Sequence, residues 1–237
     1  MRITWYGHAA FRIETEGLRI ILDPYRSPDS GGYAPIDDTA DLVVVSHEND
    51  RYHSHLGQIV PPFDVVRALE LPPEGREIRG LRFEAIHVFE NAEARDLARE
   101  KRSRAVVAMS APEEDEVTIV HFRAEGLHLA FLGDLGHPLD EPELAPLRGA
   151  NVVLVPAGGP PTIDFPDIPP LLDAIGPKLV FPMHYKTPGI NLNIQPLERF
   201  LEALPDDPVD RTGRSDHEIS RATLPGRRRI VVLEHAR

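Results

Sequence analysis

The chain has 237 residues, of which 41% are hydrophobic and 27% charged, as in an ordinary globular protein. Its formal net charge of -12 argues against nucleic acid as a partner, because binding a phosphate backbone requires a basic face. The charge still allows a small anionic substrate that is held by one Lys or Arg, or by a metal ion.

The chain contains no Cys, so it has neither a disulfide nor a thiolate ligand. Any metal site must use His, Asp, Glu and water, and this donor set favours zinc, manganese or iron. No apolar run approaches the length of a membrane span, and the N-terminus lacks the apolar stretch of a signal peptide. We therefore expect a cytoplasmic protein without a membrane partner.

The first part of the chain is predicted to be mostly β-structure. Four strands are expected, at 2–6, 11–14, 18–22 and 42–45. Glu16-Gly17 forms the turn of a hairpin between the second and third strands. Asp23-Pro24 ends the third strand, and residues 26–38 are rich in Ser, Gly, Pro and Asp, as in a loop.

The middle of the chain continues with predicted strands at 78–80, 81–86, 117–122 and 127–132. Residues 63–70 predict a short helix that Pro72-Pro73 ends. The charged run 90–104 lacks an apolar face, which predicts either an exposed helix or a mobile loop.

After residue 150, strands and helices alternate. The predicted strands are 151–155, 178–181 and 229–233, and the predicted helices are 168–175 and 196–204. Pro169-Pro170 is suited to the first turn of the earlier helix. No repeat and no linker divides the chain. We therefore expect a single domain, residues 1–237, with many strands and few helices.

Five predicted strands end in a side chain that can bind a metal. These residues are His8, His47, His87, Asp134 and His184. One such histidine is more often a packed or surface residue than a ligand, but five are harder to explain in that way. Loops after strand C-termini form the functional edge of layered sheet folds, so we expect these side chains to share one edge. Imidazoles with a carboxylate suit a hydrolytic zinc, manganese or iron centre.

With these motifs the sequence resembles the metallo-β-lactamase superfamily, in particular the metal-dependent hydrolases that include bacterial ascorbate-6-phosphate lactonases. The resemblance covers nearly the whole chain. It rests on Trp5-Tyr6-Gly7-His8, Ile21-Leu22-Asp23-Pro24, Ser46-His47, His87, Leu132-Gly133-Asp134-Leu135-Gly136-His137, Pro156-Ala157-Gly158-Gly159, Thr162-Ile163-Asp164 and Phe181-Pro182-Met183-His184-Tyr185-Lys186. It implies an α/β (α+β) fold, namely a four-layer αββα sandwich of two mixed β-sheets with helices on the outer faces.

The sequence departs from the family at its His-x-His-x-Asp-His motif, which supplies ligands to two metals. His47 holds the first position, but Asn49 replaces the second His, and Arg51-Tyr52 replaces the Asp-His pair. A one-residue shift of the loop would let His53 serve as the final His, and Asp50 could likewise replace the lost Asp. Because Asn is a poor zinc ligand and Arg is none, one ion is favoured over two.

Position by position, the resemblance assigns the metal ligands to His47, His53, His87, Asp134 and His184, with Asn49 and Asp50 as further candidates. It places His8 and His137 beside the metal, where they orient ligands or donate a proton to the leaving group. Asp164 is expected to hold a ligand imidazole in one tautomer, and Lys186 to bind a carboxylate or phosphate of the substrate. Without the resemblance, Asp134 would be read as a turn residue and Lys186 as a surface lysine.

These residues predict a metal-dependent hydrolase, in which metal-activated water attacks a small ester, lactone or phosphate-bearing metabolite. The expected cofactor is one or two divalent ions, with zinc first and manganese or iron as alternatives. The alternative hypothesis is a degenerate, inactive member that keeps the fold as a binding or regulatory protein. A third is a mononuclear enzyme with the Arg51 guanidinium in place of a second metal. The expected partner is a small-molecule substrate, with an anionic compound as one candidate. A homo-oligomer is a further candidate that the sequence leaves open.

Overall fold

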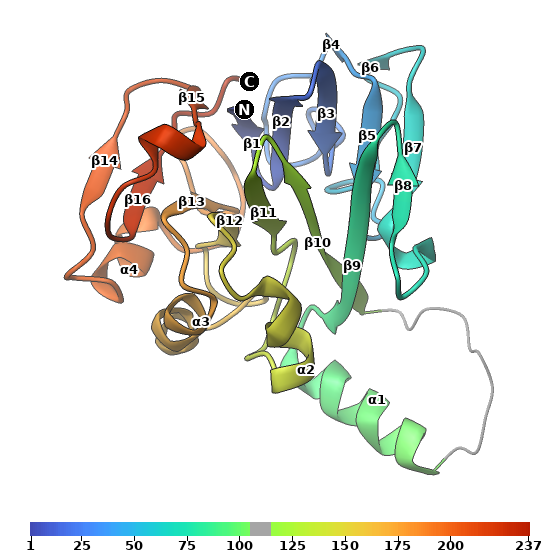
Figure 1. Ribbon diagram of the computed structural model, residues 1–237, viewed down its shortest axis with the longest axis vertical. Helices are drawn as coiled ribbons and strands as arrows, with labels where there is room; N and C mark the ends of the chain where they lie inside the picture. Colours follow the sequence, from blue (N-terminus) through green and yellow to red (C-terminus); the bar gives the residue numbers. More distant parts are fainter. Residues whose placement is uncertain (105–114) are drawn as a thin grey trace.

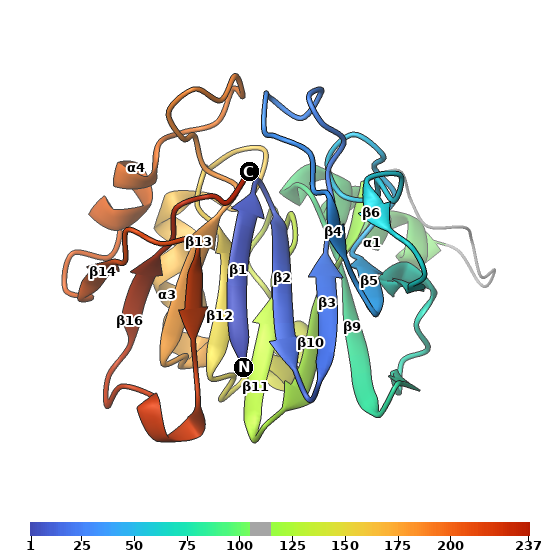
Figure 2. The ribbon, with the colours of Figure 1, turned by 90° about the horizontal axis from the view of Figure 1, so that it is seen from above.

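The computed structural model describes residues 1–104 and 115–237, in which two mixed β-sheets lie face to face (Figure 1; Figure 2). The six-stranded sheet has the order β15 (Asp216–Glu218), β1 (Arg2–Gly7), β2 (Ala10–Thr15), β3 (Leu18–Leu22), β5 (Leu42–Val45) and β7 (Asp64–Arg67). The eight-stranded sheet has the order β14 (Val209–Arg211), β16 (Arg229–Val232), β13 (Leu179–Met183), β12 (Val152–Pro156), β11 (Leu127–Phe131), β10 (Glu116–Ala124), β9 (Leu81–Phe89) and β8 (Arg76–Ile78). A separate short pair consists of β4 (Asp38–Thr39) and β6 (Ile59–Val60).

The larger hydrophobic core includes residues from both sheets. Side chains alternate along a strand, so one set of each strand can face the opposite sheet. β1 contributes Ile3 and Trp5 to this core, and Phe83 of β9 packs against Phe122 of β10 with ring centroids 5.2 Å apart. Full burial of one such side chain stabilises the fold by about 1.5–3 kcal/mol.

The α-helices of the described residues all follow β9 in the chain and lie beside the eight-stranded sheet (Figure 1). They are α1 (Ala92–Arg104), α2 (Glu141–Leu144), α3 (Ile168–Ile175) and α4 (Leu197–Glu202). α3 buries Ile168, Leu171, Leu172 and Ile175, which share one face at a spacing of three and four residues. Its predicted start is confirmed by Pro in the first turn, and Gly176 ends it with a φ of 75°.

The outer face of the six-stranded sheet is covered differently. Tyr25, Tyr33 and Ile36, from the loop between β3 and β5, form a second buried cluster with Tyr6 and Ile21 of the sheet. The predicted sandwich of two mixed sheets is confirmed. Helices cover the outside of the eight-stranded sheet, whereas in the described residues an aromatic loop packs on the other outer face.

Most predicted elements are present, and the differences have local causes. Residues 63–70 do not form a helix, because the apolar pair Val65-Val66 belongs to β7, which pairs in parallel with β5. Only 68–70 turn into a short 3₁₀ helix. The charged run predicted as helix or loop is helical from Ala92. Within the described residues, no helix has both the length and the apolar character needed to cross a membrane.

Candidate metal centre

Side chains from the ends of four strands meet at one edge of the two sheets. His8 follows β1, Asp134 follows β11, His184 follows β13, and His47 and His53 lie in the loop after β5. All five are buried, and we call them the metal cluster. Asp134 is central, because its Oδ2 lies 2.8 Å from His53 Nε2 and its Oδ1 lies 3.8 Å from His184 Nε2. The rings of His8 and His184 have centroids 4.3 Å apart, as do those of His47 and His53.

Backbone strain marks the same edge. In the described residues, six non-glycine positions have a positive φ. Three of them, Glu16, Arg79 and Glu125, directly precede a glycine in a hairpin turn, where such values are ordinary. The others are His8, Asp23 and His184, with φ of 49°, 41° and 51°. Left-handed backbone at residues other than glycine is uncommon and gathers at functional sites, so the strain supports a functional role for this edge.

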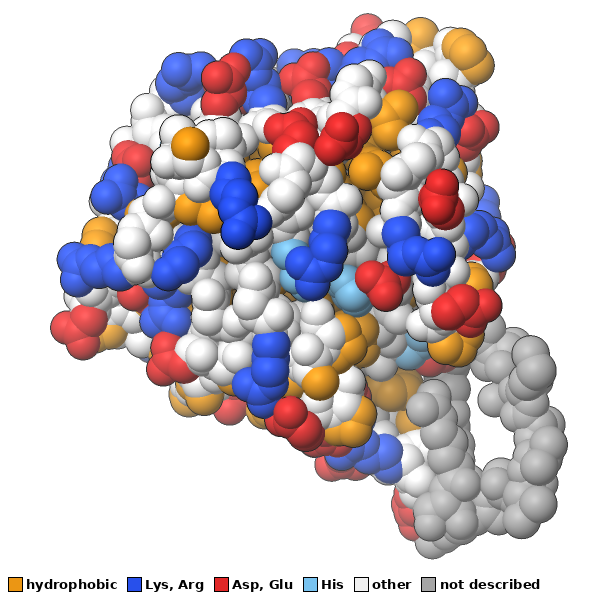
Figure 3. Space-filling view, in the orientation of Figure 1, with side chains coloured by type: hydrophobic (Ala, Val, Ile, Leu, Met, Phe, Trp, Pro, Cys, Tyr) orange, Lys and Arg blue, Asp and Glu red, His pale blue; other side chains and the backbone are white. Residues whose placement is uncertain are grey.

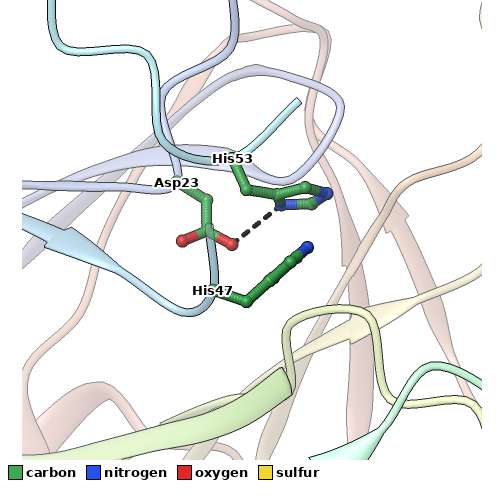
Figure 4. Close-up of side chains that lie close together, drawn as sticks. All are labelled: Asp23, His47 and His53. Carbon is green, nitrogen blue, oxygen red and sulfur yellow. Dashed lines mark hydrogen bonds and ion pairs between the residues drawn. The ribbon is translucent and has the colours of Figure 1, made fainter. Parts of the chain in front are cut away.

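Asp23 fixes the orientation of His53 through a contact with its ring (Figure 4). Its carboxylate is fully buried and lies 2.9 Å from His53 Nδ1. It also accepts hydrogen bonds from the backbone N–H and the hydroxyl of Ser46, at 2.7 and 2.5 Å. A carboxylate at Nδ1 leaves Nε2 as the nitrogen that can bind a metal. Asp23 is therefore a supporting residue whose oxygens are already engaged.

Asn49 shapes the loop that carries His53. Its backbone carbonyl accepts hydrogen bonds from the N–H groups of Tyr52, His53 and Ser54, at 3.0, 2.8 and 3.1 Å. Its side-chain oxygen accepts a further bond from the Tyr52 N–H at 3.3 Å. This tight turn brings the His53 ring to Asp134, as the predicted one-residue shift requires. The Asn49 side chain is engaged in the turn by its bond to Tyr52.

Burial and neighbouring charges set the protonation of the metal cluster. Burial lowers the pKa of His47 to about 4, and lowers the pKa of His184 and His8 below their usual range. Burial also acts to lower the pKa of His53, but the charge of Asp134 and hydrogen bonds to Asp134 and Asp23 raise it to about 10. Three imidazoles are therefore neutral near pH 7, as metal ligands must be.

Among the described residues, four buried atoms of the metal cluster find no hydrogen-bond partner. They are His8 Nδ1, His47 Nε2, Asp134 Oδ1 and His184 Nδ1. A buried polar atom without a partner costs about 1–3 kcal/mol, and four at one place call for an additional partner. All four belong to imidazole or carboxylate groups, which are ligands for zinc, manganese and iron. The residues present fit a divalent cation.

A model of the beta-lactamase superfamily domain matches residues 2–184. The chain belongs to this superfamily. A relative named as a metal-dependent hydrolase, from Carboxydothermus hydrogenoformans, is 29% identical over 205 residues, which are 79% of this chain and 85% of the relative. A second one so named, from Methanopyrus kandleri, is 26% identical over 224 residues, covering 86% and 93% of the two chains.

Among solved structures, a candidate zinc-dependent hydrolase of the metallo-beta-lactamase superfamily from Thermotoga maritima has a TM-score of 0.72. It is 28% identical to this chain and covers 98% of both chains. This similarity agrees with the predicted fold and extends beyond the matched family model to the C-terminal strands.

The structure adds Glu90, which the sequence interpretation missed, to this edge of the superfamily fold. Its Oε1 lies 3.4 Å from His47 Nε2, and its oxygen groups with Asp134 and His47 closely enough to share one ion. Burial and the charge of Asp134 raise the pKa of Glu90 to about 7. Gly136 packs so tightly beneath this residue that a Cβ there would overlap the Glu90 carbonyl oxygen.

His137 supports the segment before Glu90. Its ring is fully buried, with Nε2 accepting a hydrogen bond from the Phe89 N–H at 3.1 Å and Nδ1 lying 2.8 Å from the Pro138 carbonyl. Both ring nitrogens are thus engaged, so this geometry leaves none for the proton donation expected from the sequence. His137 instead positions the backbone that leads to Glu90.

His87 does not join the metal cluster in this geometry. Its Nδ1 lies 2.9 Å from Glu116 Oε1, and 39% of its side chain is exposed. We expect Glu90→Gln to lower metal affinity by about 10–100-fold and His87→Ala to leave it unchanged. Dialysis against a series of buffered zinc concentrations, followed by metal analysis, measures both. Equal losses in the two variants would return His87 to the ligand set.

Three other residues singled out from the sequence also lie elsewhere. Asp50 is exposed and bonds to Arg26 Nη1 and His55 Nδ1, at 2.7 and 3.0 Å. Asp164 is exposed at the start of a short 3₁₀ helix, and its carboxylate has no hydrogen-bond partner among the described residues. Lys186 is exposed and lines a cavity of about 810 Å³ whose walls include no residue of the metal cluster. These three residues lie close to family motifs in the sequence, but their side chains do not reach the metal cluster.

Proposed function

We propose that this chain is a metal-dependent hydrolase that acts on a small ester, lactone or phosphate-bearing substrate. The observation that carries the proposal is the set of four unpartnered, buried imidazole and carboxylate atoms at the edge of the two sheets. Relatives named as metal-dependent hydrolases support it. The residues that would hold the ion are His47, His53, Asp134 and His184, with Glu90 beside them.

We propose a single ion. The second motif position is Asn49, whose side-chain oxygen already accepts the Tyr52 N–H. The positions usually held by Asp and His carry Arg51, which no metal binds, and Tyr52. When bound, a divalent cation would lower the pKa of a water molecule from about 15.7 toward about 7 and would polarise the substrate oxygen.

The surrounding residues have distinct tasks in this proposal. Asp23 holds the His53 ring in the tautomer with a free Nε2. His8 is buried and neutral, and its Nδ1 has no hydrogen-bond partner in the described part of the chain, so this nitrogen can hold or pass a proton beside His184. Glu90 supplies a carboxylate at His47, where it can accept a proton from water or share the ion.

The test is turnover by protein purified without chelator, with and without added zinc, on a panel of aryl esters, lactones and phosphodiesters. We expect hydrolysis of at least one class, loss after chelation and recovery on adding zinc. Hydrolysis that is unaffected by chelation, or the absence of hydrolysis in zinc-loaded protein, would contradict the proposal and favour a binding protein with this fold.

Proton competition provides a further prediction. In the metal-free protein His53 holds a proton between Asp23 and Asp134, with a pKa of about 10. This proton must leave before Nε2 can bind a cation, so zinc affinity is expected to rise about tenfold per pH unit from pH 6.5 toward 9. Calorimetry in buffers of different ionisation enthalpy is expected to show release of about one proton. Affinity that is flat with pH would exclude His53 as a ligand.

A further inference from the structure

We infer that Arg51 binds an anionic group of the substrate at the mouth of the metal centre, remote from the bond that is cleaved. This inference rests on the proposed function and narrows it to substrates that carry a carboxylate or a phosphate. Arg51 occupies the motif position at which this chain departs from its superfamily, where an Asp is usual.

Two contacts hold the Arg51 guanidinium in place. Its Nε donates a hydrogen bond to the Asp29 carbonyl at 2.7 Å, and its central carbon lies 4.9 Å from the centre of the Tyr52 ring. Arginine stacks well on an aromatic face, and such contacts reduce its freedom. Within the described residues only the Nε of this guanidinium donates a hydrogen bond, so the two terminal amino groups remain available at the exposed surface.

The carboxylates around Arg51 are committed to other partners. Arg26 pairs with Asp29 at 3.0 Å and with Asp50 at 2.7 Å, and Glu48 pairs with a different arginine. Within the described residues, no carboxylate lies at ion-pair distance from Arg51. A guanidinium that is fixed in position but lacks an anion is suited to recognise one from solution.

A stack of rings connects this guanidinium to the metal cluster. Tyr52 lies parallel to His8, with ring centroids 5.1 Å apart and an interplanar angle of 14°. His8 in turn contacts the ring of His184. The order from the interior to the surface is therefore His184, His8, Tyr52 and Arg51. In Figure 3 histidine side chains are visible near the centre of the exposed face, with Lys or Arg side chains beside them.

The separation determines what kind of substrate fits. The anion at Arg51 would lie beyond two stacked rings from His184, so it cannot be the group that reacts at the metal cluster. It belongs to a part of the substrate several bonds away, whose binding energy helps to position the reacting bond. Arginine forms two parallel hydrogen bonds with either a carboxylate or a phosphate, so the same recognition chemistry accepts both groups.

Matched esters test the inference. We compare zinc-loaded protein on 4-nitrophenyl hexanoate, mono(4-nitrophenyl) adipate, and the ester whose remote carboxylate is replaced by a phosphonate. The charged esters are expected to have about tenfold higher kcat/KM, mainly through KM. Arg51→Gln is expected to remove this preference, with a loss on the charged esters about tenfold larger than any change on the neutral ester. A larger effect with the phosphonate would identify the preferred anion.

Arg76→Gln is the matched control, because Arg76 is an exposed arginine on β8 and its loss changes the net charge equally. It is expected to leave all three esters unchanged. A wild-type enzyme with no preference for charged esters, or equal losses on neutral and charged esters in Arg51→Gln, would overturn the inference.

A second measurement does not need turnover and separates this inference from the proposed function. Phenylglyoxal modifies accessible arginines, and peptide mapping reports each site. Adipate or phenylphosphonate is expected to protect Arg51 at least about threefold, against no protection of Arg76. If no ester is hydrolysed but Arg51 is protected, the anion site stands and the hydrolase proposal falls. Equal modification of Arg51 with and without these anions would contradict the anion site itself.

Discussion

Replacing Asp134 by Asn is expected to lower zinc affinity by more than about 100-fold and to remove metal-dependent hydrolysis. Asp134 supplies the central carboxylate of the metal cluster, facing His53 Nε2 at 2.8 Å and His184 Nε2 at 3.8 Å. Changes to residues that only support a metal ligand cost about 10–100-fold in affinity, so the loss of a ligand itself must exceed this range. Competition with a fluorescent zinc chelator measures the affinity, and circular dichroism checks the fold.

The matched control is Asp164→Asn, which changes an exposed carboxylate that the sequence had also placed at the site. It is expected to keep the wild-type zinc affinity. An Asp134→Asn variant that binds zinc as tightly as this control would show that the cluster does not hold the ion.

The second large effect is expected from Asp23→Asn, in both stability and metal affinity. The buried carboxylate accepts the Ser46 N–H and hydroxyl and bonds His53 Nδ1. Removing one partner from a buried, charged network costs about 3–5 kcal/mol in the free energy of unfolding. Because His53 also loses the group that fixes its tautomer, zinc affinity is expected to fall about 10–100-fold.

Ser46→Ala separates the two effects of Asp23. It deletes the hydroxyl's hydrogen bond to the same carboxylate and its contact with His47 Nδ1 at 3.0 Å, but leaves the bond between Asp23 and His53 in place. We expect a loss of about 1 kcal/mol in urea unfolding, and a smaller fall in zinc affinity than in Asp23→Asn. If Asp23→Asn is as stable as wild type, the carboxylate does not organise this edge.

The metal cluster was predictable where ligands follow strands directly. His8, His47, Asp134 and His184 each come within three residues of a strand end, and the sheet topology carries those ends to one edge. The pattern of apolar runs is enough to find such positions. His53 reaches the cluster only if the loop is shifted by one residue. The hydrogen bonds to the Asn49 carbonyl produce this shift, and the sequence pattern does not reveal them.

Glu90 was missed because the end of β9 was predicted too early. The sequence places the strand end before His87, but pairing with β10 continues to Phe89, opposite Glu116. The residue delivered to the edge is therefore Glu90, while His87 remains within the strand. Strand length here depends on a partner more than 25 residues away in the chain, which local patterns do not report.

Asp23 was read as the end of a strand and as part of a family motif, with no task at the site, because Asp-Pro is a common stop signal. Its structural role depends on Ser46 and His53, which are brought to it by the parallel pairing of β3 with β5. The polar edge strands β14 and β15 were missed for a related reason. Asp216-His217-Glu218 has no apolar alternation and is a strand only because it pairs with β1.

The most direct test of the account is a crystal structure of protein purified without chelator and supplied with zinc, with data collected on both sides of the zinc absorption edge. We predict one anomalous peak per chain, bounded by His47, His53, Asp134 and His184, with Glu90 beside it. A peak elsewhere, or a fully ordered cluster without a peak at saturating zinc, would contradict a metal centre at this edge.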